Sequence, residues 1–195
     1  MPTIYLIRHG VTGANKEKRF AGRSQEPLHP DGIEQIGGLA ARLGDKGIGR
    51  IVAGPLPRTR QSAEIIGDAL GVPVATNDAF NEIFLPHWDA LTKDEIRARF
   101  GDEYPTWLAD PAGFTVAGCE TIAAVQQRAV RAMEQLFADN DQPILVVTHL
   151  IVARALILHY RQLPIADFRA IAVDNGALVT FRRTDDGATE IFQTA

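Results

Sequence analysis

The spacing of short apolar runs is the feature that most constrains the fold of this chain. Mostly apolar runs of three or four residues recur at residues 4–7, 51–53, 72–75, 144–147 and 178–181. Stretches with helical periodicity lie between most of them. Buried strands that alternate with helices are typical of α/β proteins whose parallel strands are covered on both faces. The pattern therefore predicts an α/β three-layer sandwich with a mostly parallel central sheet flanked by helices.

Three longer stretches carry apolar residues at the spacing of one helix face. Residues 31–43 show this spacing directly after Pro30, a common residue at a helix start. Residues 58–70 and 120–137 follow the same pattern. No internal repeat, low-complexity tract or linker divides the sequence, so we expect a single domain over residues 1–195.

Residues 77–118 break this alternation. The segment holds three prolines, several aromatic residues and a short helical stretch at residues 93–100. It is too long for a simple connection, and long insertions commonly cover a functional site. We therefore expect a cap over a site. The alternative is an insertion that only shields the core, because aromatic side chains bury well anywhere.

Composition excludes several classes of partner. Twenty basic and 24 acidic residues give a formal net charge of -4, and neither sign forms a long run, so no nucleic-acid surface is expected. The single cysteine, Cys119, cannot pair within the chain and indicates a reducing compartment. No export signal is recognisable, and the apolar stretch at residues 144–160 is interrupted by His149 and Arg154. We expect a cytoplasmic protein without membrane association.

Polar residues stand where four of the predicted strands end or shortly beyond. Arg8 and His9 follow the first run, Arg58 follows the second, Glu82 lies beyond the third, and His149 follows the fourth. Ligands of open α/β sheets bind outside the carboxyl ends of the strands. Each residue alone is more often structural, but together they favour one site at this edge of the sheet.

These residue types suit the transfer of a phosphoryl group. A neutral imidazole can attack phosphorus, two guanidiniums match phosphate oxygens, and a protonated carboxylic acid can protonate the departing alcohol. Fixed positive charges stabilise the transition state without a metal. No His-x-x-x-His or Cys-x-x-Cys spacing occurs, so we expect neither a metal site nor another cofactor.

Several motifs in order along the chain carry a family resemblance. They are "LIRHGVTGAN", "EPLHPDGIEQ", "AGPLPRTRQSAEII", "NEIFLPHWDALT", "GCETIAAVQQR" and "ILVVTHLIVARALI". In these segments the chain resembles the histidine phosphatase superfamily, which includes the cofactor-dependent phosphoglycerate mutases. The resemblance extends from Thr3 to about Phe181. It implies a phosphoglycerate mutase-like fold with a short cap insertion at residues 77–118.

The resemblance also implies roles for the five residues at the sheet edge. His9 would become a phosphohistidine, while Arg8, Arg58 and His149 would hold the phosphoryl group. Glu82 would act first as general acid and then as general base.

Further residues are expected around the substrate. Asn15 would donate a hydrogen bond to the phosphate, and Leu150 stands where the family usually has glycine. The expected substrate-binding residues are Thr12, Asn15, Gly22, Arg23, His87 and Leu150. Pro86, Asp89 and Ala90 also depart from the residues common in the family, which affects substrate identity more than chemistry.

We therefore expect a phosphoric monoester hydrolase that acts on a small phosphorylated metabolite. The mutases of the family carry a longer segment between the matches of Glu82 and Gly118, and the shorter segment here favours entry of water. Two alternatives remain: a mutase-type phosphotransferase, and a non-catalytic phosphate-binding protein on the same fold. The sequence does not choose the substrate, and it leaves open whether the chain forms a homodimer.

Overall fold

A six-stranded sheet forms the centre of the computed structural model, which describes residues 1–138 and 142–194. The strands are β1 (Thr3–Arg8), β2 (Arg50–Ala53), β3 (Val74–Thr76), β4 (Ile144–Thr148), β5 (Leu178–Arg183) and β6 (Thr189–Thr194). Their order is β3-β2-β4-β1-β5-β6. The first four strands in that order are parallel, and β5 and β6 are antiparallel to their neighbours. The predicted mostly parallel sheet is confirmed.

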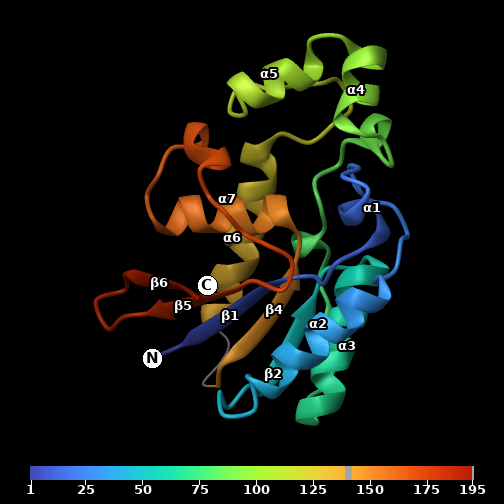
Figure 1. Cartoon of the computed structure of the whole chain (residues 1–195). Coiled ribbons are helices and arrows are strands. Elements are labelled where there is room, and N and C mark those ends of the chain that lie inside the picture. Colours follow the sequence, from blue (N-terminus) through green and yellow to red (C-terminus); the bar gives the residue numbers. More distant parts are fainter. Residues whose placement is uncertain (139–141, 195) are drawn as a thin grey trace.

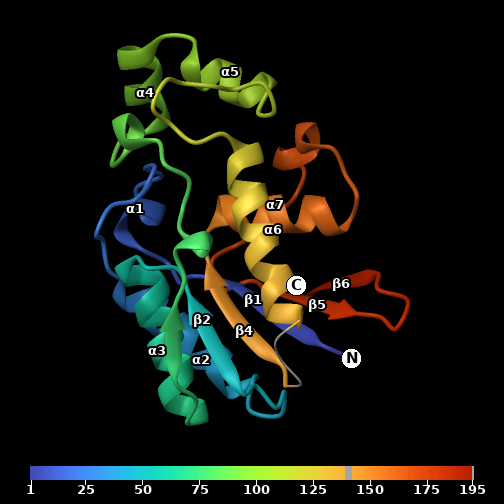
Figure 2. The same ribbon diagram turned by 180° about the vertical axis from the view of Figure 1, so that it is seen from behind.

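Helices cover both faces of the sheet (Figure 1, and from behind in Figure 2). On one side lie α2 (Pro30–Ala41) and α3 (Pro57–Leu70), and on the other α6 (Ile122–Ala138) and α7 (Leu150–Tyr160). The predicted three layers are confirmed. Although α7 is strongly apolar, no helix in the described part of the chain combines the length and apolarity needed to cross a bilayer.

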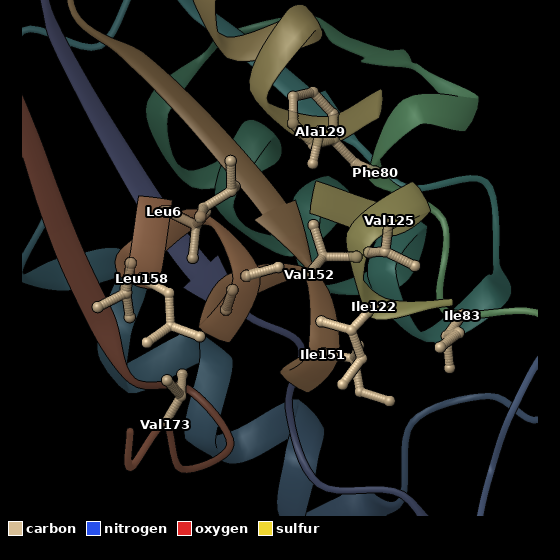
Figure 3. Close-up of a cluster of buried hydrophobic side chains, with 14 of the residues drawn as sticks. Leu6, Phe80, Ile83, Ile122, Val125, Ala129, Ile151, Val152, Leu158 and Val173 are labelled. Carbon is tan, nitrogen blue, oxygen red and sulfur yellow. The ribbon is translucent and has the colours of Figure 1, made fainter. Parts of the chain in front are cut away.

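The alternation of side chains along β1 divides the core into two clusters. Ile4 and Leu6 pack with α6 and α7, whereas Ile7 packs beneath α2 and α3. Figure 3 shows part of the first cluster, to which Val125 of α6 and Val152 of α7 also contribute. Burying one such side chain stabilises the fold by about 1.5–3 kcal/mol.

The insertion at residues 77–118 lies beyond the carboxyl ends of the parallel strands (Figure 1). It contains two 3-10 turns, Asp78–Phe80 and Pro86–Trp88, followed by α4 (Lys93–Phe100) and α5 (Glu103–Ala109). Outside the insertion, α1 (Gly13–Lys16) follows β1, and a 3-10 turn at Ile165–Arg169 follows α7.

Trp88 forms the centre of the insertion. It is fully buried, and its ring contacts those of Phe20, Tyr104, Trp107 and Phe114 at centroid distances of 5.1 to 6.0 Å. Aromatic pairs of this kind contribute about 0.5–1.5 kcal/mol beyond their buried area. The same cluster continues into the core around α6 and α7, so the insertion is anchored to the sheet and does not form a separate core.

Candidate active site

The loop after β1 sets the orientation of His9. The main-chain N–H of His9 donates to the carbonyl oxygen of Thr148 at 3.0 Å, which ties the end of β1 to the end of β4. Its ring Nδ1 lies 2.8 Å from the carbonyl oxygen of Gly10. A carbonyl oxygen only accepts hydrogen bonds, so Nδ1 carries the proton and Nε2 keeps its lone pair. His9 therefore presents an unprotonated Nε2, an atom that is chemically able to act as a nucleophile.

Asn175, which the sequence analysis did not identify, holds this loop from the other side. Its Nδ2 donates to the carbonyl oxygen of His9 at 3.0 Å and to Oδ1 of Asn15 at 3.0 Å. The same Oδ1 accepts from the main-chain N–H of Thr12. Asn15 is thus held by its oxygen, and its amide N–H groups are available to a ligand. The available signal was the Asp-Asn-Gly turn before β5.

Arg58 is buried in the first turn of α3. Its Nη2 donates to the carbonyl oxygen of Gly22 at 2.6 Å and its Nη1 to that of Ser24 at 3.1 Å. Gly22 has a φ of +50°, and a Cβ there would overlap the carboxylate of Asp89. The loop that orients the Arg58 guanidinium therefore requires glycine at this position.

Arg8 provides the second buried guanidinium. Its Nη1 donates to the carbonyl oxygen of Val173 at 2.8 Å. Burial lowers the pKa of Arg8 to about 10, although the nearby Glu82 carboxylate raises it. Burial also lowers the pKa of Arg58. Guanidinium is so strongly basic that both side chains remain charged at neutral pH.

His149 follows β4 at the start of α7. Its ring lies 5.3 Å from that of His9, measured between centroids, at an interplanar angle of 62°. Burial, followed by the charge of Arg58, lowers the pKa of His149 well below its ordinary value. The same two causes lower the pKa of His9. Both rings are therefore neutral at neutral pH.

Glu82 lies in an irregular segment just beyond the first 3-10 turn of the insertion. One of its carboxylate oxygens accepts from the main-chain N–H of Ile83 at 2.8 Å. Burial raises the pKa of Glu82, and that hydrogen bond and the charge of Arg58 offset the rise only in part. Glu82 therefore keeps its proton to a higher pH than an exposed glutamate, as a general acid requires.

One cavity of about 320 Å³ brings most of the predicted site together. The predicted residues that line it are Arg8, His9, Asn15, Gly22, Arg58, Glu82 and Leu150. Two further members of the predicted site lie outside the lining: His149 contacts the ring of His9, and the buried Thr12 caps α1 by accepting from the main-chain N–H of Asn15.

Arg23 and His87 also lie outside this lining, so the cavity does not bring them together with the other expected substrate-binding residues. Arg23 donates to the carbonyl oxygen of Glu82 at 2.9 Å and pairs with Glu120. Nε2 of His87 lies 2.7 Å from the carboxylate of Glu103. Both side chains are hydrogen-bonded to other groups of the protein. The sequence could not show this because those groups belong to other parts of the chain.

Four buried nitrogen atoms at the site have no hydrogen-bond partner in residues 1–138 and 142–194. They are Nε of Arg8, Nε of Arg58, and Nδ1 and Nε2 of His149. Buried polar atoms are rarely left unpaired, and those that are often mark a ligand site. Guanidinium donors suit an oxyanion such as a phosphoryl group. Over the same residues, no group of three His, Cys, Asp or Glu side chains is arranged to hold a metal ion.

Comparison with known proteins gives a consistent result. A family model described as the histidine phosphatase superfamily (branch 1) matches residues 4–192. The adenosylcobalamin/alpha-ribazole phosphatase of Salmonella typhimurium is 26% identical over 174 residues, which cover 89% of this chain and 86% of that protein. The solved structure of Bacillus stearothermophilus YhfR has a TM-score of 0.92 at 26% identity and covers 98% of this chain and 95% of its own.

A bifunctional protein of Mycobacterium tuberculosis is also similar, at 28% identity over 181 residues. The match covers 92% of this chain but 46% of that protein, so the chain spans about half the length of this relative. The family match extends over nearly the whole chain, and the resemblance seen in the motifs is confirmed. The chain therefore belongs to the histidine phosphatase superfamily, branch 1.

Proposed function

We propose that this chain is a phosphoric monoester hydrolase that acts on a small phosphorylated metabolite through a phosphohistidine on His9. One observation carries the proposal. The hydrogen bond from Nδ1 of His9 to Gly10 leaves Nε2 unprotonated in a cavity that Arg8 and Arg58 also line. The family and the phosphatase among the relatives support hydrolysis.

In the first step, Nε2 of His9 attacks the phosphorus atom in line with the ester oxygen. The N–P bond forms while the P–O bond to the alcohol breaks. Glu82 gives its proton to the departing oxygen, so a neutral alcohol leaves and Glu82 becomes a carboxylate. Arg8, Arg58 and Asn15 stabilise the charge on the three equatorial oxygens.

In the second step, water attacks the phosphohistidine. The Glu82 carboxylate takes a proton from the water as the new P–O bond forms and the N–P bond breaks. Inorganic phosphate is released, and both His9 and Glu82 return to their starting protonation states. The step balances without an oxidant, a reductant or a metal.

The side chains that line the cavity influence which substrates can bind. Leu150 places an apolar side chain in the lining, where many members of the family have glycine. It makes the cavity narrower and less polar beside the reacting group. We expect this difference to exclude some substrates of other family members without changing the chemistry.

A panel of phosphorylated metabolites tests the proposal, with released phosphate measured in the presence of EDTA. We expect the wild-type protein to release phosphate and His9→Ala to lose at least a hundredfold in rate, roughly the effect of removing a group essential to one step. Equal rates in both proteins would refute it, as would no release from any ester. Stimulation by a bisphosphorylated glycerate, with phosphate transferred to a second hydroxyl, would indicate a mutase.

A further inference from the structure

Glu120 lies outside the cavity, yet its carboxylate is tied to both arginines that approach the Glu82 segment. Its Oε2 accepts from Nη2 of Arg23 at 2.8 Å, and its Oε1 accepts from Nε of Arg128 at 2.9 Å. Oε2 also accepts from the main-chain N–H of Phe84 at 2.9 Å. All three charged side chains are between one fifth and one third exposed. We call Glu120, Arg23 and Arg128 the Glu120 clamp.

The clamp holds the main chain on both sides of Glu82. Nε of Arg23 donates to the carbonyl oxygen of Glu82 at 2.9 Å, and Nη2 of Arg128 donates to the same oxygen at 3.3 Å. Nη1 of Arg128 donates to the carbonyl oxygen of Ala79 at 2.7 Å. The main-chain N–H of Glu120 donates to the carbonyl oxygen of Phe84 at 3.0 Å. Residues 79–84 are therefore fixed at several main-chain atoms.

This segment has no other regular support. Residues 81–85 belong to neither a helix nor a strand, so no repeating backbone pattern fixes the position of Glu82. Proton transfer requires the acid within hydrogen-bond reach of the leaving oxygen. A misplacement of about 1 Å can cost on the order of a hundredfold in rate. The position of Glu82 therefore depends on hydrogen bonds from side chains that lie outside the cavity lining.

The clamp also connects the acid to the phosphate-binding side of the site. Arg23 directly follows Gly22, whose carbonyl oxygen orients Arg58. One short loop thus contacts both the guanidinium that would bind the phosphoryl group and the main chain that carries the acid. Any shift of this loop would change the distance between the two.

We propose that Glu120 is a positioning residue for proton donation: through Arg23 and Arg128 it holds Glu82 at the distance from the phosphoryl site that protonation of the leaving alcohol requires. This inference rests on the proposed function, because it needs Glu82 as the general acid. It goes further in assigning a role in the reaction to three residues that do not line the cavity.

A comparison of two leaving groups distinguishes a positioning role of Glu120 from a general effect on the stability of the protein. The phenolate of an activated aryl ester departs without a proton, whereas an alkoxide needs one. Loss of correct positioning should therefore slow an alkyl ester far more than p-nitrophenyl phosphate. A general loss of folded protein would lower both rates equally.

The test compares Glu120→Gln with wild type on p-nitrophenyl phosphate and on the best alkyl ester from the panel. We expect about a tenfold loss of kcat on the alkyl ester, a fraction of the effect of a general acid, and less than about a twofold loss on the aryl ester. The matched control is Glu134→Gln, which also breaks a pair with an arginine, Arg183. Glu134 lies on α6, about 18 Å along the axis from Ile122, and this change should alter neither rate.

Arg128→Lys provides a second variant that keeps the charge but cannot bridge Ala79, Glu82 and Glu120. It should show the same selective loss, whether or not Glu120→Gln folds. Equal losses on both esters, or no loss, in a variant that folds would overturn the inference.

Glu82→Gln tests the proposed acid role of Glu82 separately from the positioning role of Glu120. If Glu82→Gln is selective and the clamp variants are not, only the inference fails; if Glu82→Gln is itself unselective, the acid role fails and the inference with it.

Discussion

The ring of His149 meets that of His9 edge-on, with the two centroids 5.3 Å apart, and neither nitrogen of His149 has a partner in the described part of the chain. Burial lowers the pKa of both rings, and the charges of Arg58 and Arg8 lower it further. A bound dianion offsets that positive field. The pKa of His149 should therefore rise when an oxyanion enters the site.

Oxyanion binding is expected to take up protons. Sulfate is a suitable probe because its own charge does not change near neutral pH. Isothermal titration calorimetry at pH 7 in two buffers of different ionisation enthalpy should show uptake of up to about one proton per site. In His149→Asn most of this uptake should disappear. The same binding enthalpy in both buffers for the wild type would contradict the prediction.

The pH dependence of kcat/KM should be bell-shaped, with its optimum on the acidic side of neutrality. His9 must be neutral to attack, and its pKa is well below the ordinary value, so the rate falls only at low pH. Glu82 must be protonated to donate, and its pKa is raised, so the rate falls again as pH rises through that value. Comparing Glu82→Gln with wild type cancels the ionisation of the substrate. The variant should lose the alkaline decline; its persistence would mean that another group is the acid.

Arg58→Ala should lower kcat/KM by a factor that corresponds to about 3 kcal/mol, or more than a hundredfold, because in the proposed mechanism Arg58 contacts the phosphoryl group that is transferred. His29→Ala is the comparison. His29 accepts the main-chain N–H of Asp31 at the start of α2, so its loss should cost about 1 kcal/mol of stability and leave turnover unchanged. Steady-state kinetics and thermal melts on both variants provide the check. Equal kinetic losses would place the site elsewhere.

Gly54→Ala should disturb the site although position 54 carries no functional group. A Cβ there would lie 2.6 Å from the carbonyl oxygen of Phe80 and 3.2 Å from Nε2 of His149. Both the segment that leads to Glu82 and the second histidine would have to move, and we expect roughly a tenfold or larger loss of kcat. In Gly38→Ala, where nothing lies within 4 Å of the added Cβ, stability should rise by roughly 0.5–1 kcal/mol without a kinetic effect.

The sequence predicted those parts of the fold in which local pattern and burial agree. The strands that became β1, β2 and β4 are apolar because both of their faces are covered, so their runs were visible. In contrast, β6 lies at the edge of the sheet beside β5, and its Thr-Glu-Ile-Phe-Gln-Thr sequence has no apolar run. The helix α5 was not predicted because Pro105 interrupts the pattern, although the first turn of a helix tolerates proline.

The site residues also divide into those that the local sequence pattern indicates and those that it does not. Arg8, His9, Arg58 and Glu82 could be placed together because the carboxyl ends of parallel strands share one edge. The partners of Arg23 and the role of Asn175 were missed, because they depend on contacts between residues 59 to 166 positions apart. Chain topology determines which edge the functional groups share. Side-chain geometry then determines which of them reach the ligand.

His9 precedes by more than 160 positions one of the residues that hold its loop in place. Asn175 holds the carbonyl oxygen of His9, and Val173 accepts from Arg8, so the histidine loop needs a segment that follows it by 166 positions. On the ribosome, a growing chain cannot make these bonds until that segment has left the exit tunnel. The loop that holds His9 therefore reaches its final arrangement only after residues 173–175 have been synthesised.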